Sequence, residues 1–246
     1  MPFDLTTLDG PFVALKAFDW GGDAAPLAAI DAAVIAAHGD AALRADLEKR
    51  FVALLGPGTS RATKEYVCRK LSLIGTPASV PALAALLADA AESHMARFAL
   101  ERMAAPEAGV ALREALGRVS GDLKIGVVGS LAKRRDAECV PLIAPLLTAD
   151  PKTAAAAAAA LGIIGSEAAI ESLEKADAAA GNAVAAAVAD GRLACAEKLL
   201  AAGKRAAALA AYRSLATAAA GKPAAKQIEL AATRGVLACM DATASS

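Results

Sequence analysis

A pattern that recurs about every 30 residues is the feature that most limits how this 246-residue chain folds. The sequence LIGT at 73–76 returns as IIGS at 163–166, three repeat units later. The repeat after the first one matches it at a spacing of 29 residues instead of 30: Leu100, Pro106 and Leu112 correspond to Leu71, Pro77 and Leu83. Other apolar positions keep the same step: Leu71, Leu131 and Leu161; Val80, Val140 and Ile170; Leu83, Ile143 and Leu173. Self-similarity at this period is typical of a solenoid, in which stacked repeats share one core.

Each unit has room for two helices of about 12 residues, each about 18 Å long. Apolar residues follow the helical period, and no convincing two-residue alternation of β-branched residues occurs. Alanine, leucine, glutamate, lysine and arginine also favour helix. We therefore expect an all-α fold, a right-handed α-solenoid of stacked helical hairpins.

Three regions follow from the repeat pattern. Residues 60–177 hold four repeats of about 30 residues each. Residues 1–59 form an N-terminal helical cap, with helices expected at 11–18, 24–37 and 41–55. Residues 178–246 have longer helices that continue the solenoid and end in a frayed tail.

Most of the aromatic residues lie in the cap: Phe3, Phe12, Phe18, Trp20 and Phe51. A terminal repeat must cover the open end of the core, and bulky side chains suit that task. Trp20 beside Gly21-Gly22 could alternatively serve as a ligand platform. Asp23 and Asp40 are candidate helix N-caps.

Composition limits the classes of partner. The chain has 26 Lys+Arg against 26 Asp+Glu, so its formal net charge is zero. This balance argues against a protein that neutralises nucleic-acid phosphates or an anionic membrane surface. Hydrophobic residues make up 57%, but the best candidate for a membrane span, the fourteen uncharged residues 153–166, is too short and too rich in alanine to cross a bilayer. The opening residues do not read as a signal peptide, so we expect a cytoplasmic protein, or an exported one if an upstream signal was removed.

The cysteines are predicted to be small buried hydrophobes. They are far apart and lie among apolar residues: Cys68, Cys139, Cys195 and Cys239. The two histidines, His38 and His94, do not lie near a cysteine in sequence, so we expect no metal site. Unpaired cysteines favour a reducing compartment.

The sequence offers no catalytic or cofactor-binding motif. Both the G-x-G-x-x-G pattern and the P-loop are missing. Residues 126–130, GVVGS, nearly match a nucleophile elbow but lie within a predicted helix, where the two glycines would permit close helix packing. The carboxylates of Glu167, Glu171 and Glu174 share one helix face, which is typical of a solvent-facing stripe.

Several short basic runs, at 49–50, 69–70, 133–135 and 204–205, raise the alternative of a nucleic-acid-binding solenoid. Each run has acidic neighbours or lies near a helix end, where cations complement the helix dipole. We therefore expect these residues to be solvated rather than to bind nucleic acid.

The segment DPKTAAAAAAALGIIGSEAAIESL, with its Asp-Pro opening and LGIIG turn, resembles a HEAT-like repeat of the phycobilisome-lyase type. Two further segments, SHMARFALE and KEYVCRKLSLIGT, are similar to HEAT-repeat proteins of planctomycete-type bacteria. The stretch LLAAGKRAAALAAYRSLA resembles a tetratricopeptide hairpin. The resemblance implies a fold but no activity, and the His-Glu pairs of HEAT-repeat hydroxylases are missing.

By this resemblance, the second helices of the repeats line the concave face. Their core positions take Val80, Leu83, Leu87, Val140, Ile143 and Leu147. The positions left nearer the surface carry few charges: Pro81, Ala84, Ala85, Pro141, Ala144 and Pro145. An exposed apolar strip of this kind marks a protein interface.

The sequence therefore predicts a noncatalytic scaffold whose apolar strip contacts a protein partner, another domain or a second copy. A HEAT-like enzyme or lyase accessory protein is the alternative, and a nucleic-acid-binding solenoid the third. Alanine at tolerant surface positions would explain the same strip without any binding.

Overall fold

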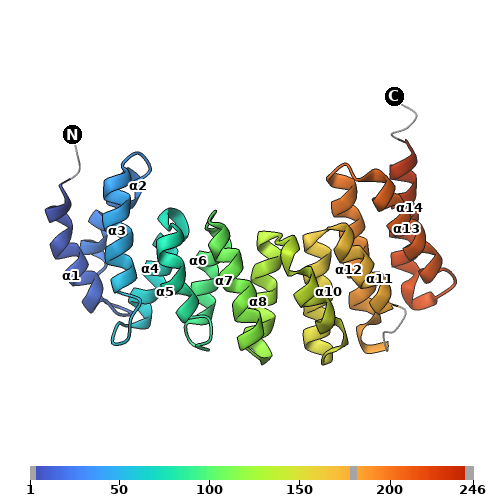
Figure 1. Cartoon of the computed structure of the whole chain (residues 1–246), viewed down its shortest axis with the longest axis horizontal. Helices are drawn as coiled ribbons and strands as arrows, with labels where there is room; N and C mark the ends of the chain where they lie inside the picture. Colours follow the sequence, from blue (N-terminus) through green and yellow to red (C-terminus); the bar gives the residue numbers. More distant parts are fainter. Residues whose placement is uncertain (1–3, 178–181, 242–246) are drawn as a thin grey trace. The chain divides into compact units, whose positions relative to one another are not determined.

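The computed structural model describes residues 4–177 and 182–241, and throughout these residues the secondary structure is helical (Figure 1). The helices are packed as hairpins, which confirms the predicted all-α fold of stacked helical hairpins. The chain divides into two compact units, residues 1–130 and 131–246, and the boundary falls inside one helix, α8. In the part of the chain that is described, no helix is both long and apolar enough to cross a bilayer.

Unit 1 contains helices α1 to α7 and most of α8, together with short 3₁₀ helices labelled η. In chain order these are η1 (Leu5–Leu8), α1 (Asp9–Ala17), η2 (Ala25–Leu27), α2 (Ala28–Ala36), α3 (Ala41–Ala53), α4 (Arg61–Ile74), η3 (Pro77–Ser79), α5 (Val80–Ala85), α6 (Ser93–Arg102), α7 (Pro106–Arg118) and α8 (Gly121–Arg134).

Unit 2 contains the end of α8 and the remaining helices. These are η4 (Ala137–Cys139), α9 (Val140–Ile143), η5 (Ala144–Thr148), α10 (Pro151–Ile164), α11 (Glu167–Asp177), α12 (Asn182–Ala201), α13 (Arg205–Ala219), η6 (Pro223–Ala225) and α14 (Lys226–Asp241).

Within each unit the repeats form two layers. The first helices pack side by side, α4 against α6 in unit 1 and α10 against α12 in unit 2. The second helices do the same, α5 against α7 and η5 against α11. The core lies between the layers, and all six predicted core residues of α5, α9 and η5 and the turn after α5 are buried. The repeating apolar pattern therefore identifies the core correctly.

Two of the second helices are shorter than the roughly 12 residues that the spacing predicts, whereas α7 has 13 residues and α11 has 11. In place of a continuous helix, the chain forms η3 followed by the six-residue α5, and η4 followed by the four-residue α9 and η5. In the second case Pro145 lies where a continuing helix would need a backbone N–H donor, so the chain tightens into a 3₁₀ turn.

Helix capping follows the sequence closely. The Asp40 carboxylate accepts hydrogen bonds from the backbone N–H groups of Ala42 and Leu43, which confirms it as the N-cap of α3. Asp23 accepts one bond from the Ala25 N–H at the start of η2. At the other end of a helix, Gly165 follows α10 with a φ of 65°, a left-handed conformation that favours glycine.

The aromatic residues of the cap do not all cover the core. Phe12 and Phe51 pack with ring centroids 5.3 Å apart, as expected of a cap. Trp20, however, is 63% exposed, so the expectation that it helps to close the core is wrong. Trp20 lies in the turn after α1, whereas Phe12 is a buried residue of α1 itself. Phe3 lies outside the described residues.

The C-terminal region forms longer helices, as predicted. Helices α12 and α13 make a hairpin that turns at Gly203, whose φ is 76°. Helix α14 packs against α13 and α12. The expected frayed tail falls at 242–246 and lies outside the described residues. The regional boundaries at 59/60 and 177/178 stay predictions.

Candidate interaction surface

The six predicted surface residues fall into two groups of three. Pro81, Ala84 and Ala85 lie on α5 in unit 1, where Pro81 and Ala85 are exposed and Ala84 is half-buried. The other group lies in unit 2. There Pro141 and Pro145 are exposed and Ala144 is half-buried.

The apolar faces are bounded by charge and do not continue across every second helix. Beside α5, the surface of α7 carries Glu114 and Arg118, which form an ion pair of 2.6 Å between Arg118 Nη2 and Glu114 Oε2. Beside η5, the surface of α11 carries Glu167 and Glu171. The apolar face of α5 and that of α9 and η5 are therefore each bordered by charged residues of a neighbouring second helix, and the role of the six residues in binding stays a prediction.

Leu142 adds to the apolar surface in unit 2, with 46% of its area exposed. Its neighbours Val140 and Ile143 are buried. The exposure of Leu142 could have been predicted from the sequence, because Leu142 does not fall on the helix face that carries Val140, Ile143 and Leu147.

A groove of about 500 Å³ adjoins Ala85 in unit 1. Its apolar lining comes from the end of α3, the following turn and α5: Val52, Leu55, Pro57, Ala82, Ala85 and Leu86. Its polar lining consists of Lys64, Asp89 and Glu92. Lys64 is 6% exposed and forms an ion pair with Glu92, while Asp89 is exposed. The groove thus combines apolar walls with two carboxylates and one buried ammonium group.

Polar contacts between successive repeats fix the helices that carry these surfaces. The Lys64–Glu92 pair spans 28 residues, and so do the bonds that Glu48 accepts from Thr76. Arg97 donates to the Gly126 carbonyl 29 residues later, at 3.0 Å. These separations match the repeat length, so each bond joins equivalent places in neighbouring units. The sequence alone does not predict these polar contacts, because the two residues of each contact can be identified only once the alignment of neighbouring repeats is known.

Gly126 makes room for a guanidinium group and does not bring two backbones together. A Cβ at Gly126 would lie 2.7 Å from Cζ of Arg97, whereas one at Gly129 would meet nothing within 4 Å. The expectation that both glycines permit close helix packing is therefore wrong. Both lie inside α8, as the sequence predicts for this near match to a nucleophile elbow.

We expect Gly126→Ala and Gly129→Ala to differ in their effect on stability. Alanine in a helix interior is favoured over glycine by about 1 kcal/mol, so Gly129→Ala should raise the free energy of unfolding by about that amount. Gly126→Ala must displace Arg97 and weaken its bond to the Gly126 carbonyl, so it should cancel that gain or reverse it. Urea unfolding followed by circular dichroism measures both. Equal stabilisation by the two variants would contradict the packing described here.

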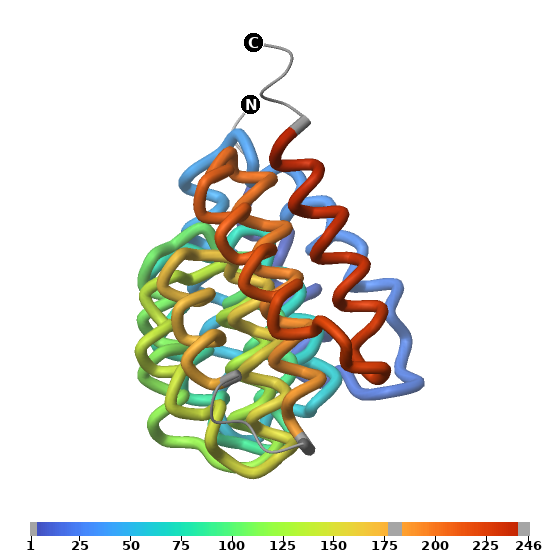
Figure 2. Tube along the Cα trace, turned by 90° about the vertical axis from the view of Figure 1, so that its right-hand side faces the viewer, coloured from blue at the N-terminus to red at the C-terminus, as the bar shows by residue number. Residues whose placement is uncertain are grey.

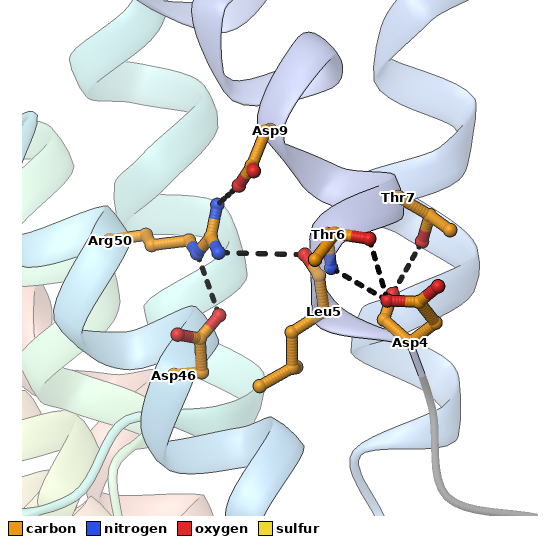
Figure 3. Close-up of polar contacts among 7 residues, drawn as sticks. All are labelled: Asp4, Leu5, Thr6, Thr7, Asp9, Asp46 and Arg50. Atoms are coloured by element: carbon orange, nitrogen blue, oxygen red, sulfur yellow. Dashed lines mark hydrogen bonds and ion pairs between the residues drawn. The ribbon is translucent and has the colours of Figure 1, made fainter.

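Several charged residues in the described part of the chain join different helices, and others pair within one helix. In Figure 3, Arg50 of α3 donates to Asp9 at 2.7 Å, to Asp46 at 2.6 Å and to the Leu5 carbonyl, which ties α3 to η1 and α1. The contact with Asp9, followed by that with Asp46, raises the pKa of the Arg50 guanidinium. Other members of the basic runs also pair with acids: Arg69 with Glu65, Lys70 with Asp31, and Lys204 with Glu167.

The predicted glutamate stripe on α11 is partly a packing feature. Glu171 is exposed, as expected of a solvent-facing stripe. Glu174, by contrast, contacts Nη2 of Arg192 at 3.4 Å, and the same nitrogen donates to Oγ of Ser214 at 2.8 Å. Because Arg192 is 2% exposed, these contacts compensate a buried charge and join α11, α12 and α13.

Groups of three or more candidate metal ligands are not found among residues 4–177 and 182–241. His38 and His94 are both exposed; His38 lies in the turn after α2 and His94 lies on α6. His38 Nδ1 lies 3.2 Å from the Ile35 carbonyl oxygen, at the end of α2.

All four cysteines are buried thiols, which confirms the prediction. Burial raises the pKa of Cys68 to about 12, with a further contribution from Glu92, and burial also raises that of Cys195 to about 12. An unfolded thiol ionises at a pH of about 8.5. The folded state therefore favours the neutral thiol, so its stabilisation is complete below that pH and is lost as pH rises towards 12.

We expect native thiols to resist alkylation at pH 8 and all four to react in denaturant. The folded chain holds Cys68 and Cys195 protonated and away from solvent, whereas thiolates are the reactive species. Mass spectrometry after iodoacetamide treatment counts the modified residues. We also expect the urea midpoint to fall between pH 8 and pH 10. Rapid labelling of Cys68 in the native chain would contradict this environment.

Comparison with known proteins supports the repeat assignment. A family model described as HEAT repeats matches residues 109–191, about a third of the chain. No curated protein sequence matches. Among solved structures, a crystal structure of an engineered protein is 21% identical to this chain and has a TM-score of 0.43, and the match covers 79% of this chain and 97% of that one. The family match identifies HEAT repeats within the all-α fold of stacked helical hairpins.

Proposed function

We propose that the chain is a noncatalytic interaction module that binds a protein partner or another domain through the exposed faces of α5 and of α9 and η5. HEAT repeats generally serve as protein-interaction scaffolds, and repeats match over 109–191. The observation that carries the proposal is the groove beside Ala85. Its apolar walls suit a side chain from a partner, and the exposed carboxylate of Asp89 favours a segment that also presents a lysine or arginine.

The proposal extends to the absence of a catalytic centre. The buried charged groups described above, Glu48, Lys64 and Arg192, contact neighbouring helices and hold repeats together. No specific observation favours an enzyme, a lyase accessory protein or a nucleic-acid-binding solenoid. Resemblance to the phycobilisome-lyase type, to planctomycete proteins and to tetratricopeptide units stays a prediction, as does a cytoplasmic location.

Site-specific photo-crosslinking tests this surface. A benzophenone amino acid at Ala85 or Pro145 is expected to capture the same protein from an extract of the native source. The matched control carries the probe at Leu73, which is 60% exposed on α4 in the first layer. Replacing Ala85 with glutamate in a probe-at-Pro145 chain, and Pro145 with glutamate in a probe-at-Ala85 chain, shows whether both faces contribute.

Capture at Ala85 and Pro145 but not at Leu73, with loss of capture in the glutamate variants, is the expected outcome. Equal capture at all three positions would show nonspecific adhesion and contradict the proposal. A second contradictory outcome is a product at Leu73 alone, because the partner would then occupy the first layer.

A further inference from the structure

An open space runs along α3 in unit 1, between α3 and the second helix of the next hairpin. Helix α3 contacts that hairpin through α4 and η3, whereas α5 packs against α7 on its other side. Figure 2 shows a closer arrangement in unit 2, where α13 and α14 lie side by side. The space beside α3 is therefore open to a partner.

This space consists of two hollows that meet at Val52 of α3. One is the groove beside Ala85, which lies at the C-terminal end of α3. The other, of about 580 Å³, lies towards the N-terminal end of α3 and reaches η3. From Ala41 to Val52, which both line this second hollow, α3 advances about 16 Å. We call the two hollows together the α3 groove.

Four charged groups that line the α3 groove are already engaged within the protein. Arg44 donates to two backbone carbonyls at the end of α4, and Glu48 accepts from the residue that precedes η3. Lys64 forms an ion pair with Glu92. These groups hold the walls of the groove in place.

The other two charged residues of the lining are exposed, and they have opposite signs. Lys49 lies in the second hollow and Asp89 in the groove beside Ala85. Within residues 4–177 and 182–241, neither forms an ion pair. The Asp89 carboxylate accepts hydrogen bonds from the backbone N–H groups of Ala91 and Glu92, at 2.7 and 3.1 Å, which fix its position.

The contrast in charge persists when the engaged groups are counted. In the second hollow Arg44 and Lys49 outnumber Glu48. In the groove beside Ala85 the two carboxylates outnumber the single ammonium group. One part of the α3 groove is therefore positive and the other negative, with apolar walls in both.

We propose that the α3 groove binds a short segment of a protein partner that presents an acidic residue to Lys49 and a basic residue to Asp89, with apolar residues between them. The inference rests on the proposed function and specifies the chemistry of the partner. Opposite charges favour this arrangement, and like charges oppose the reversed one, so the charges also set the direction in which the segment lies. An extended segment advances about 3.3 Å per residue, so about five residues cover the second hollow.

Selection from a random peptide library displayed on phage tests this pairing without knowledge of the native partner. The wild-type chain is expected to enrich peptides that have an acidic residue on one side of an apolar stretch and a basic residue on the other. Lys49→Glu should enrich peptides that are basic on both sides. Asp89→Lys should enrich peptides that are acidic on both sides.

Matched controls make the same charge changes outside the groove. Lys16→Glu on α1 and Asp19→Lys in the turn after it alter exposed residues, and both should select the wild-type pattern. Asp89→Asn is a second variant at the groove. Its side-chain oxygen still accepts from the backbone N–H groups, so the local fold is retained while the charge is lost.

Fluorescence anisotropy with a synthetic copy of the selected peptide measures the size of each contact. Asp89→Asn and Lys49→Gln are each expected to weaken binding about threefold, as the loss of one exposed ion pair does. In the double variant Lys49→Glu with Asp89→Lys, a peptide whose acidic and basic residues are exchanged should bind about as tightly as the selected peptide binds wild type.

Peptide patterns that stay the same in wild type, Lys49→Glu and Asp89→Lys would overturn the proposal, as would the enrichment of no common pattern by wild type. Light scattering adds a third test. A dimer of the purified chain that the selected peptide dissociates would make a second copy the occupant, which also overturns the proposal.

These failures differ from a failure of the proposed function. Capture of a protein by the crosslinker at Ala85, with peptide selection unchanged by the charge variants, would leave the interaction module intact and overturn only the paired charges. Selection that shifts as expected, with no protein captured at Ala85 or Pro145, would support the charge pairing in the α3 groove and contradict the broader partner surface.

Discussion

Replacing Gly191 with alanine is expected to lower the free energy of unfolding of unit 2 by about 3 kcal/mol. Helices α10 and α12 cross at two glycines, Gly162 and Gly191. A Cβ at Gly191 would lie 2.5 Å from the carbonyl oxygen of Ala158, and one at Gly162 would lie 2.8 Å from that of Gly191. The obstacle in each case is backbone, so no side-chain rotation relieves it and the helices must separate.

The expected sign is the reverse of the usual helix preference. Alanine normally improves a helix interior by about 1 kcal/mol relative to glycine, and Gly129→Ala on α8 is the control for that gain. Denaturant unfolding gives the stability of both variants, and amide exchange in α10 and α12 shows where the loss occurs. Faster exchange in α10 and α12 is the specific result. A Gly191→Ala chain as stable as Gly129→Ala would contradict the close crossing.

The sequence predicts the helices and the core because both depend on local spacing. Val80, Leu83 and Leu87 fall on one helix face whatever lies opposite, so their burial follows from periodicity alone. The Asp40 cap is local as well, because its carboxylate bonds to N–H groups two and three residues ahead. These features need no knowledge of how repeats are stacked.

Contacts between repeats could not be predicted in the same way. The crossing at Gly162 and Gly191, and the space that Gly126 leaves for Arg97, depend on which residues meet across layers. A glycine within a predicted helix indicates that another group approaches closely, but it does not show which residue that group belongs to. The break between α9 and η5 near Pro145 was easier to predict from the sequence, because proline cannot donate a backbone hydrogen bond.

The candidate surface was predicted position by position but not as a whole. Pro81, Ala85, Pro141 and Pro145 are exposed as expected, since they fall outside the core register. The sequence did not show which charged residues border these positions, because that depends on how neighbouring second helices pack. The Glu114–Arg118 pair on α7, beside α5, is one example. Nor did the repeat pattern indicate that Trp20, Leu230 and Leu237 would be exposed.

Glu48→Ala is expected to lower the free energy of unfolding of unit 1 by about 3 kcal/mol, since hydrogen bonds to charged groups contribute about 1.5–3 kcal/mol each. The Glu48 carboxylate, 5% exposed on α3, accepts bonds from the backbone N–H of Thr76 at 2.6 Å and from its hydroxyl at 2.8 Å. One turn earlier, Arg44 donates to the carbonyls of Ile74 and Gly75. The α3 helix thus caps the end of α4 and the start of η3 in the next hairpin.

Glu48→Gln separates the hydrogen bond from the charge. Its amide oxygen still accepts from the Thr76 N–H, so the glutamine variant should fall between wild type and Glu48→Ala in urea unfolding. The matched control is Glu65→Ala, which removes a partner of the exposed Arg69 and should change stability by less than about 1 kcal/mol. Equal losses for Glu48→Ala and Glu65→Ala would contradict the capping role. Because Glu48 and Thr76 lie one repeat apart, a large and specific loss would show that stability in this chain depends on polar contacts between repeats as well as on the apolar layer.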